Sequence, residues 1–177
     1  MSTAVSYEAI HATPSTSANP QAQRLAERLE QGARALVRVA SNLSDAQWKT
    51  RMPVDGRTVG VIVHHVASVY PVEIQLAQIL AQGRPVEGVT MQTVHEMNAA
   101  HALEHAEVTR EEAIDLLQKN SAAAAAAIRA LSDEQLRHAA PASLYSDAPV
   151  TCQFMLEDHA VRHSYHHLLR IRTLLHL

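Results

Sequence analysis

The sequence predicts an all-α protein, a four-helix bundle with short extra helices in its connections. Only 5 of its 177 residues are glycine and 3% are aromatic, a composition that disfavours a turn-rich β fold. Alanine, leucine, glutamine, glutamate and arginine recur instead, and these residues have high helix propensity. The length fits one domain, which we expect over residues 20–177, after an N-terminal arm at residues 1–19.

Capping signals place the expected helices along the chain. Asn19 before Pro20 is typical of a helix start, and Gly83 is typical of the residue after a helix end. A serine or threonine three positions before glutamine or glutamate forms a capping box. Such pairs are Ser44 and Gln47, Thr93 and Glu96, Thr109 and Glu112, and Ser132 and Gln135. We expect long helices from residue 20, over 57–82 and 110–130, and from residue 147 to the C-terminus, with a shorter helix over 93–107.

A weak internal repeat supports the arrangement of these helices. The pattern Leu-Ser-Asp-x-Gln begins at Leu43 and again at Leu131, and a proline follows each copy. Each copy joins a long helix to a following helix that carries histidines. We therefore expect two helical hairpins that pack together as a bundle.

Charge and cysteine content exclude several classes of protein. A net charge of −3 gives no basic surface for nucleic acid, so we expect no nucleic-acid partner. Residues 59–80 are apolar but contain histidines, a proline and a glutamate, which makes a membrane span unexpected. The single cysteine, Cys152, fits a reducing compartment, and no secretory signal is recognised, so we expect a cytoplasmic protein.

The spacing of the 12 histidines predicts which of them face the core. In the last helix, one line of mostly apolar residues steps by three or four positions, as the buried stripe of an amphipathic helix does. This line contains Leu156, Ala160, His163, His167, Ile171 and Leu174. His159 and His166 fall on the opposite, polar line, and we expect both to face water.

The same test separates two adjacent histidines of the second long helix. His65 shares an apolar line with Ile62, whereas His64 falls on a line with Arg57. Of this pair, His65 is therefore expected to face the core. His101 and His105 are also four residues apart, but their surroundings are mixed, so we interpret them as part of a solvated face.

Three inward histidines, His65, His163 and His167, could bind one divalent metal ion. Two imidazoles one helical turn apart can bind the same ion, as they do in the zinc-protease helix motif. A third ligand from a facing helix leaves coordination positions open, which is typical of catalytic sites. The alternative is that these are core histidines hydrogen-bonded to neighbours, although three such buried groups would each need a partner.

Two other kinds of site are less consistent with the sequence. A ferritin-like di-iron site needs paired Glu-x-x-His motifs in the bundle, and the chain has only Glu8-x-x-His11, in the N-terminal arm. Cys152 lies near the start of the last helix, where a thiol can be activated. We interpret it instead as a buried structural thiol.

Two segments resemble motifs of the DinB-like, or YfiT-like, superfamily of four-helix-bundle metalloenzymes. Residues 57–67, RTVGVIVHHVA, are similar to a family motif that ends in His-aliphatic-Ala, which aligns His65 with the family's ligand. Residues 163–167, HSYHH, are similar to its C-terminal His-x-x-His-His, whose first and last histidines bind metal. Many members continue with Arg-Gly-Gln, where this chain has Leu168, Leu169 and Arg170.

The resemblance implies a metal-dependent enzyme, either a transferase that uses a low-molecular-weight thiol or a hydrolase. It implies one divalent ion held by His65, His163 and His167, with zinc, nickel, iron and manganese not distinguished. The expected partners are a small-molecule substrate or thiol and a second copy of the chain in a homodimer. A non-catalytic, stress-related bundle that binds metal or a small ligand is the alternative.

Overall fold

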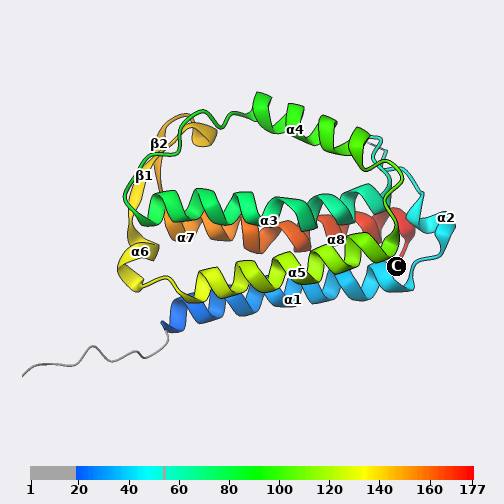
Figure 1. Cartoon of the computed structure of the whole chain (residues 1–177), viewed down its shortest axis with the longest axis horizontal. Helices are drawn as coiled ribbons and strands as arrows, with labels where there is room; N and C mark the ends of the chain where they lie inside the picture. Colours follow the sequence, from blue (N-terminus) through cyan, green and yellow to red (C-terminus); the bar gives the residue numbers. More distant parts are fainter. Residues whose placement is uncertain (1–18, 54) are drawn as a thin grey trace, which may run out of the picture.

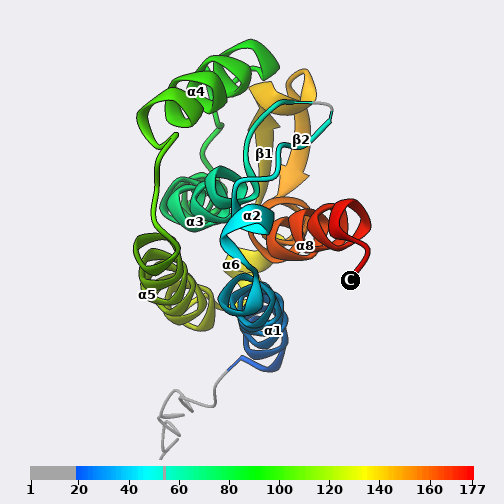
Figure 2. The ribbon, with the colours of Figure 1, turned by 90° about the vertical axis from the view of Figure 1, so that its right-hand side faces the viewer.

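Four long helical segments form the body of the protein in this computed structural model, which describes residues 19–53 and 55–177. They are α1 (Pro20–Asn42), α3 (Val59–Ala81), α5 (Arg110–Arg129) and a C-terminal segment made of α7 (Cys152–Met155), η2 (Leu156–Val161) and α8 (Arg162–Leu175). Seen along their axes, α1, α3, α5 and α8 lie at the corners of a bundle (Figure 2). The predicted four-helix bundle is confirmed. Of the expected arm at residues 1–19, residues 1–18 lie outside the described residues, and Asn19 is the N-cap of α1.

The core lies between these four segments because each turns an apolar side inward. On α1, Leu25, Leu29 and Leu36 recur at helical spacing and are fully buried. α3 is apolar around most of its circumference, as expected of the most enclosed helix. It is long and apolar enough to cross a membrane by length and composition, but 56% of its most apolar window is buried inside the protein. α3 is therefore a core helix of this bundle.

α3 contains Pro71 and is nevertheless continuous from Val59 to Ala81. Proline has no N–H, so the carbonyl of Ala67 loses its partner within the helix. Asn120 of α5 donates a hydrogen bond from Nδ2 to that carbonyl at 2.9 Å. The interruption is thus repaired by a side chain of the neighbouring helix.

Short helices occupy the connections, as the sequence predicts. They are α2 (Asp45–Trp48), α4 (Met91–Glu104) and α6 (Asp133–Arg137). The capping boxes predicted at Ser44, Thr109 and Ser132 are present. The box predicted between Thr93 and Glu96 is wrong, because the hydroxyl of Thr90 caps the helix by accepting from Thr93 N, and α4 therefore starts at Met91.

The last helix begins later than predicted. A two-stranded antiparallel hairpin, β1 (Ala139–Ala142) and β2 (Ala148–Thr151), precedes it. Ser146 and Asp147 both have positive φ, 56° and 60°, which is the geometry of a tight hairpin turn. Asp147 therefore turns the chain instead of capping a helix. Thr151 is the helix cap, with its hydroxyl accepting from the backbone N–H of Phe154.

Candidate metal centre

Three histidines from two helices converge in the bundle between α3 and α8. His65 comes from α3, and His163 and His167 come from successive turns of α8. One nitrogen of each imidazole lies within 4.8 Å of the corresponding nitrogens of the other two. Nε2 of His65 and Nε2 of His163 are 3.2 Å apart. The structure thus brings together the three residues that the sequence singles out.

The helix that carries two of these histidines is irregular just before them. η2 is a π-helical segment, and such segments are frequent at functional sites. Directly after it, Ser164 of α8 and Tyr70 of α3 form a buried hydrogen bond of 2.6 Å. Both side chains are fully buried, and burial raises the pKa of the Tyr70 hydroxyl, which stays protonated. This contact fixes α8 against α3 beside the histidines.

Glu73 contacts the ring nitrogen of His163 that faces away from His65. Nδ1 of His163 donates to Oε1 of Glu73 at 2.5 Å, and Glu73 is only 6% exposed. A carboxylate that accepts from one ring nitrogen leaves the other nitrogen free to bind metal and fixes the orientation of the ring. Sequence analysis missed Glu73, although a glutamate within so apolar a helix is a signal that could have found it.

His65 and His167 are neutral at physiological pH. Burial, reinforced by the nearby His163, lowers the pKa of His65 to about 2. Burial and the same neighbour also lower the pKa of His167 far below its usual range. A neutral imidazole has a free lone pair, which metal binding requires.

The donor set fits a divalent ion. Tetrahedral coordination at zinc–nitrogen distances of about 2.0–2.1 Å places two ligand nitrogens roughly 3.3 Å apart, close to the 3.2 Å between His65 and His163. Nδ1 of His167 is buried and has no hydrogen-bond partner among the described residues. A buried polar atom without a partner is costly, and a metal ion is one way to satisfy this imidazole.

His64 lies on a different side of α3 from His65, as the sequence predicts, but it is also buried. His64 is 8% exposed, but it lies on the side of α3 that faces α4 instead of the side that faces α8. Its Nδ1 is 2.9 Å from Nε2 of His101, and its ring is centred 4.1 Å from that of His105, tilted by 39°. His101 and His105 are half-buried, so their interpretation as a solvated face is wrong. Burial, with His105 and His64 nearby, lowers the pKa of His101 to about 4.

Of the other singled-out residues, His166 and Cys152 agree with the sequence predictions and His159 does not. His166 is exposed, as predicted. His159 is half-buried and contacts the hydroxyl of Tyr145 at 2.9 Å, so its placement in water is corrected. Cys152 is fully buried, and burial raises the pKa of its thiol to about 11, which agrees with a structural role.

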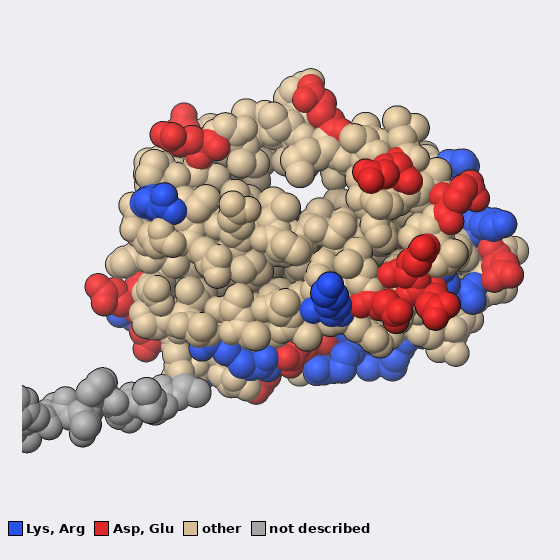
Figure 3. Space-filling view, viewed as in Figure 1, with Lys and Arg blue, Asp and Glu red and all other residues tan. Residues whose placement is uncertain are grey.

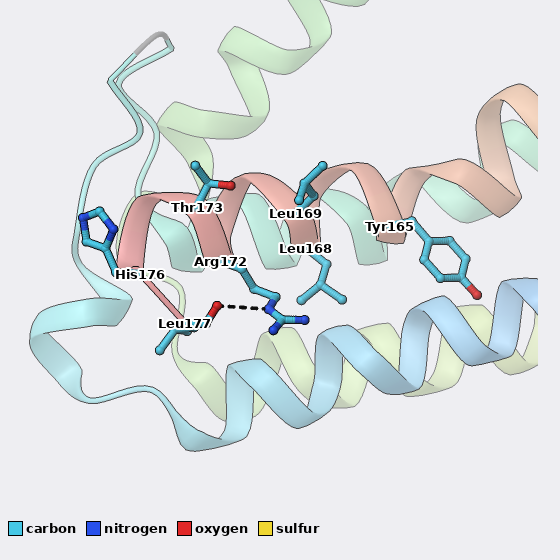
Figure 4. A pocket seen from close by; sticks show the side chains of 7 residues that line it. All are labelled: Tyr165, Leu168, Leu169, Arg172, Thr173, His176 and Leu177. Carbon is cyan, nitrogen blue, oxygen red and sulfur yellow. Dashed lines mark hydrogen bonds between the residues drawn. The ribbon is translucent and has the colours of Figure 1, made fainter.

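A separate surface pocket of about 500 Å³ lies along the outer side of α8 (Figure 4). Its lining comprises Tyr165, Leu168, Leu169, Arg172, Thr173, His176 and Leu177. Figure 4 shows Nε of Arg172 donating to the carbonyl of Leu177, at 3.4 Å. None of the three converging histidines belongs to the described lining, so we place the candidate centre between α3 and α8 instead.

Comparison with protein families gives a match that covers most of the chain. The model of the DinB superfamily matches residues 28–171. The chain belongs to the DinB superfamily. No curated protein sequence matches it significantly.

Two solved structures have a similar fold. YfiT from Bacillus subtilis, described as a probable metal-dependent hydrolase with an unusual four-helix bundle topology, has a TM-score of 0.69 at 21% identity. That match covers 92% of this chain and 90% of YfiT. A mycothiol-dependent maleylpyruvate isomerase has a TM-score of 0.65 at 16% identity, covering 85% of this chain and 60% of the isomerase. At these identities the similarity establishes the DinB fold alone.

Proposed function

We propose that this protein is a metal-dependent enzyme whose divalent ion is bound by His65, His163 and His167. Its reaction is a thiol-dependent transfer or a hydrolysis. The observation that carries the proposal is the convergence of three imidazole nitrogens within 4.8 Å, with a buried carboxylate on one of them. The similarity in fold to a probable metal-dependent hydrolase and to a mycothiol-dependent isomerase supports metal dependence and the use of a thiol.

Each residue has a distinct task in this proposal. Glu73 keeps the proton of His163 on Nδ1, so that Nε2 presents its lone pair to the centre. The low dielectric around His65 and His167 keeps both rings uncharged and ready to bind. A divalent ion with three neutral ligands keeps its full charge, lowers the pKa of a bound water or thiol and polarises a substrate.

The test has two steps and uses untagged protein. Metal analysis after purification without chelator should find an ion, and the cobalt-substituted protein should change its absorption spectrum when a low-molecular-weight thiol is added. His167→Ala should abolish this response, whereas His166→Ala, which alters an exposed neighbour, should retain it. A centre closed by a fourth protein side chain, with a spectrum indifferent to thiol, would contradict the enzymatic proposal.

A non-catalytic bundle that binds metal or a small ligand is the second candidate. It is favoured by the contacts of the three rings, which among the described residues hydrogen-bond only to Glu73 and to each other and engage no side-chain nucleophile. Turnover of thiol or ester substrates by the metal-loaded protein distinguishes the two candidates. Metal binding without turnover would favour the non-catalytic bundle.

We also propose a homodimer, which the family resemblance implies and which small residues on the helical faces would allow. Sedimentation equilibrium at micromolar concentration tests it directly. A single monomeric species would remove the dimer and leave the metal centre unaffected.

A further inference from the structure

A second group of three histidines lies between α3 and α4. His64 comes from α3, His101 from α4, and His105 from the residue that ends α4. One nitrogen of each ring lies within 4.8 Å of the other two. The ring of His105 is centred 4.1 Å from that of His64 and 4.6 Å from that of His101. The ligand nitrogens of both groups thus lie within the same 4.8 Å of one another.

α4 has little other attachment to the bundle. None of the residues of α4 is buried in the described structure, and Met97 and Leu103 are 55% and 82% exposed. Figure 1 shows α4 lying apart from α3, and Figure 3 shows an opening between α4 and the body of the protein. Hydrophobic burial therefore explains the position of α4 poorly. The three histidines form its clearest side-chain contact with α3.

The surroundings of this group are acidic. His64 and His105 line a surface pocket of about 680 Å³, whose charged lining is four acidic residues and one lysine: Glu104, Glu107, Glu112, Asp115 and Lys119. Acidic side chains gather on this face over the start of α5 and the end of α4 (Figure 3). Carboxylates around an opening raise the local concentration of cations.

We propose that His64, His101 and His105 form a second divalent-metal site, which attaches α4 to α3. The site would take an ion that accepts imidazole ligands, such as zinc or cobalt. His101 supports this directly, because its Nδ1 is buried without a hydrogen-bond partner in the described part of the chain. Hydrogen bonds among the three imidazoles alone leave that atom unsatisfied.

The two sites are neighbours but distinct. His64 and His65 are consecutive on α3 and point to different partners, His64 to α4 and His65 to α8. The ring centroids of His65 and His101 are 5.6 Å apart. An experiment must therefore distinguish two separate ions from one ion shared by both histidine groups.

Metal stoichiometry of the untagged full-length chain tests the proposal. Equilibrium dialysis against Zn²⁺, followed by elemental analysis, should give two ions per chain for the natural protein. His101→Ala and His105→Ala should each leave one ion, and His163→Ala should also leave one. His95→Ala is the matched control, because His95 is an exposed histidine on the same helix, and it should leave two.

Hydrogen exchange of the α4 amides gives a second test. Zinc bound elsewhere on the surface would change the ion count but would not protect these amides. At a Zn²⁺ concentration 100 times the dissociation constant, amides of residues 91–104 should exchange up to about 100-fold more slowly than without metal. The same protection should appear in His163→Ala and should be absent in His101→Ala. Because His101 is half-buried on a weakly packed helix, its variant should fold, and circular dichroism checks this.

The outcomes separate this inference from the proposed function. One ion that is retained by His101→Ala and lost by His163→Ala overturns the second site and leaves the first intact. One ion that is lost by both variants shows a single shared centre and also overturns the second site. One ion that is lost by His101→Ala and retained by His163→Ala supports the second site and overturns the first.

Discussion

The carboxylate of Glu73 accepts a hydrogen bond of 2.5 Å from Nδ1 of His163, although the two residues are 90 positions apart in the chain. Glu73 is on α3 and His163 on α8, so the contact spans the two helices that supply the three imidazoles. It places the proton of His163 on the nitrogen that faces away from His65. The free nitrogen then points toward Nε2 of His65, 3.2 Å away.

Replacing Glu73 tests this relationship. Glu73→Gln should weaken metal binding about 10- to 100-fold, because the amide can still accept the hydrogen bond but no longer carries the negative charge that strengthens the ligand. Glu73→Ala should weaken it further, since the ring of His163 is then unsupported. Isothermal titration with Zn²⁺ measures both effects. Glu87→Gln, an exposed glutamate on the α3–α4 connection, should bind like the natural protein.

The ligand assignment predicts a contrast within one helix. His163→Ala should abolish tight binding at the first centre, whereas His166→Ala and His159→Ala should leave it nearly intact. His166 is exposed, and the ring of His159 is engaged by the hydroxyl of Tyr145. Titration of a His101→Ala background with cobalt isolates the first centre. Equal loss in all three variants would contradict the assignment.

Helical periodicity was sufficient to find the first histidine group. The line through Leu156, His163 and His167 follows the regular spacing of a buried stripe, and Leu156 and His167 are buried. The chain positions of α1, α3 and α5 followed from caps and apolar spacing for the same reason. Such local signals depend on neighbours three or four residues apart, which a sequence displays directly.

Features that depend on distant contacts could not be found this way. The position of α4 over His64 is set by side chains on two helices, and α4 has no buried stripe to reveal its orientation. The partnership of Glu73 with His163 requires knowing which turn of α3 faces which turn of α8. The turn at Asp147 was misassigned because aspartate before an alanine and proline is equally typical of a helix start.

A packing prediction concerns Gly60 and Trp48, the only tryptophan of the chain. A Cβ at Gly60 would lie 2.5 Å from Cε2 and Nε1 of the indole. The ring cannot move without weakening the hydrogen bond from Nε1 to the carbonyl of Val108, 3.1 Å long. The clash should cost about 1–3 kcal/mol, and the higher helix propensity of alanine returns at most about 1 kcal/mol. Gly60→Ala should therefore lower the free energy of unfolding.

Urea unfolding followed by circular dichroism measures this change, since the control background has no tryptophan whose fluorescence could be followed. In a Trp48→Ala background the clash is absent, so Gly60→Ala should cost little or be stabilising there. The same destabilisation in both backgrounds would show that Trp48 is not the cause.

The last prediction concerns the pH dependence of the metal-free protein. In the unfolded chain His65 has the ordinary pKa of 6.5, and in the folded protein burial lowers it to about 2. Between these values the unfolded state binds a proton that the folded state does not. The free energy of unfolding therefore falls as the pH drops below 6.5, by about 1.4 kcal/mol per pH unit for this histidine once the pH is well below that value. His167 acts in the same direction, because its pKa is also lowered by burial.

Urea unfolding in the presence of chelator at pH 7 and pH 5 should show this loss of stability. His65→Gln should reduce the loss, since glutamine does not titrate. A free energy of unfolding that is equal at the two pH values would mean that these imidazoles are not buried in the metal-free protein.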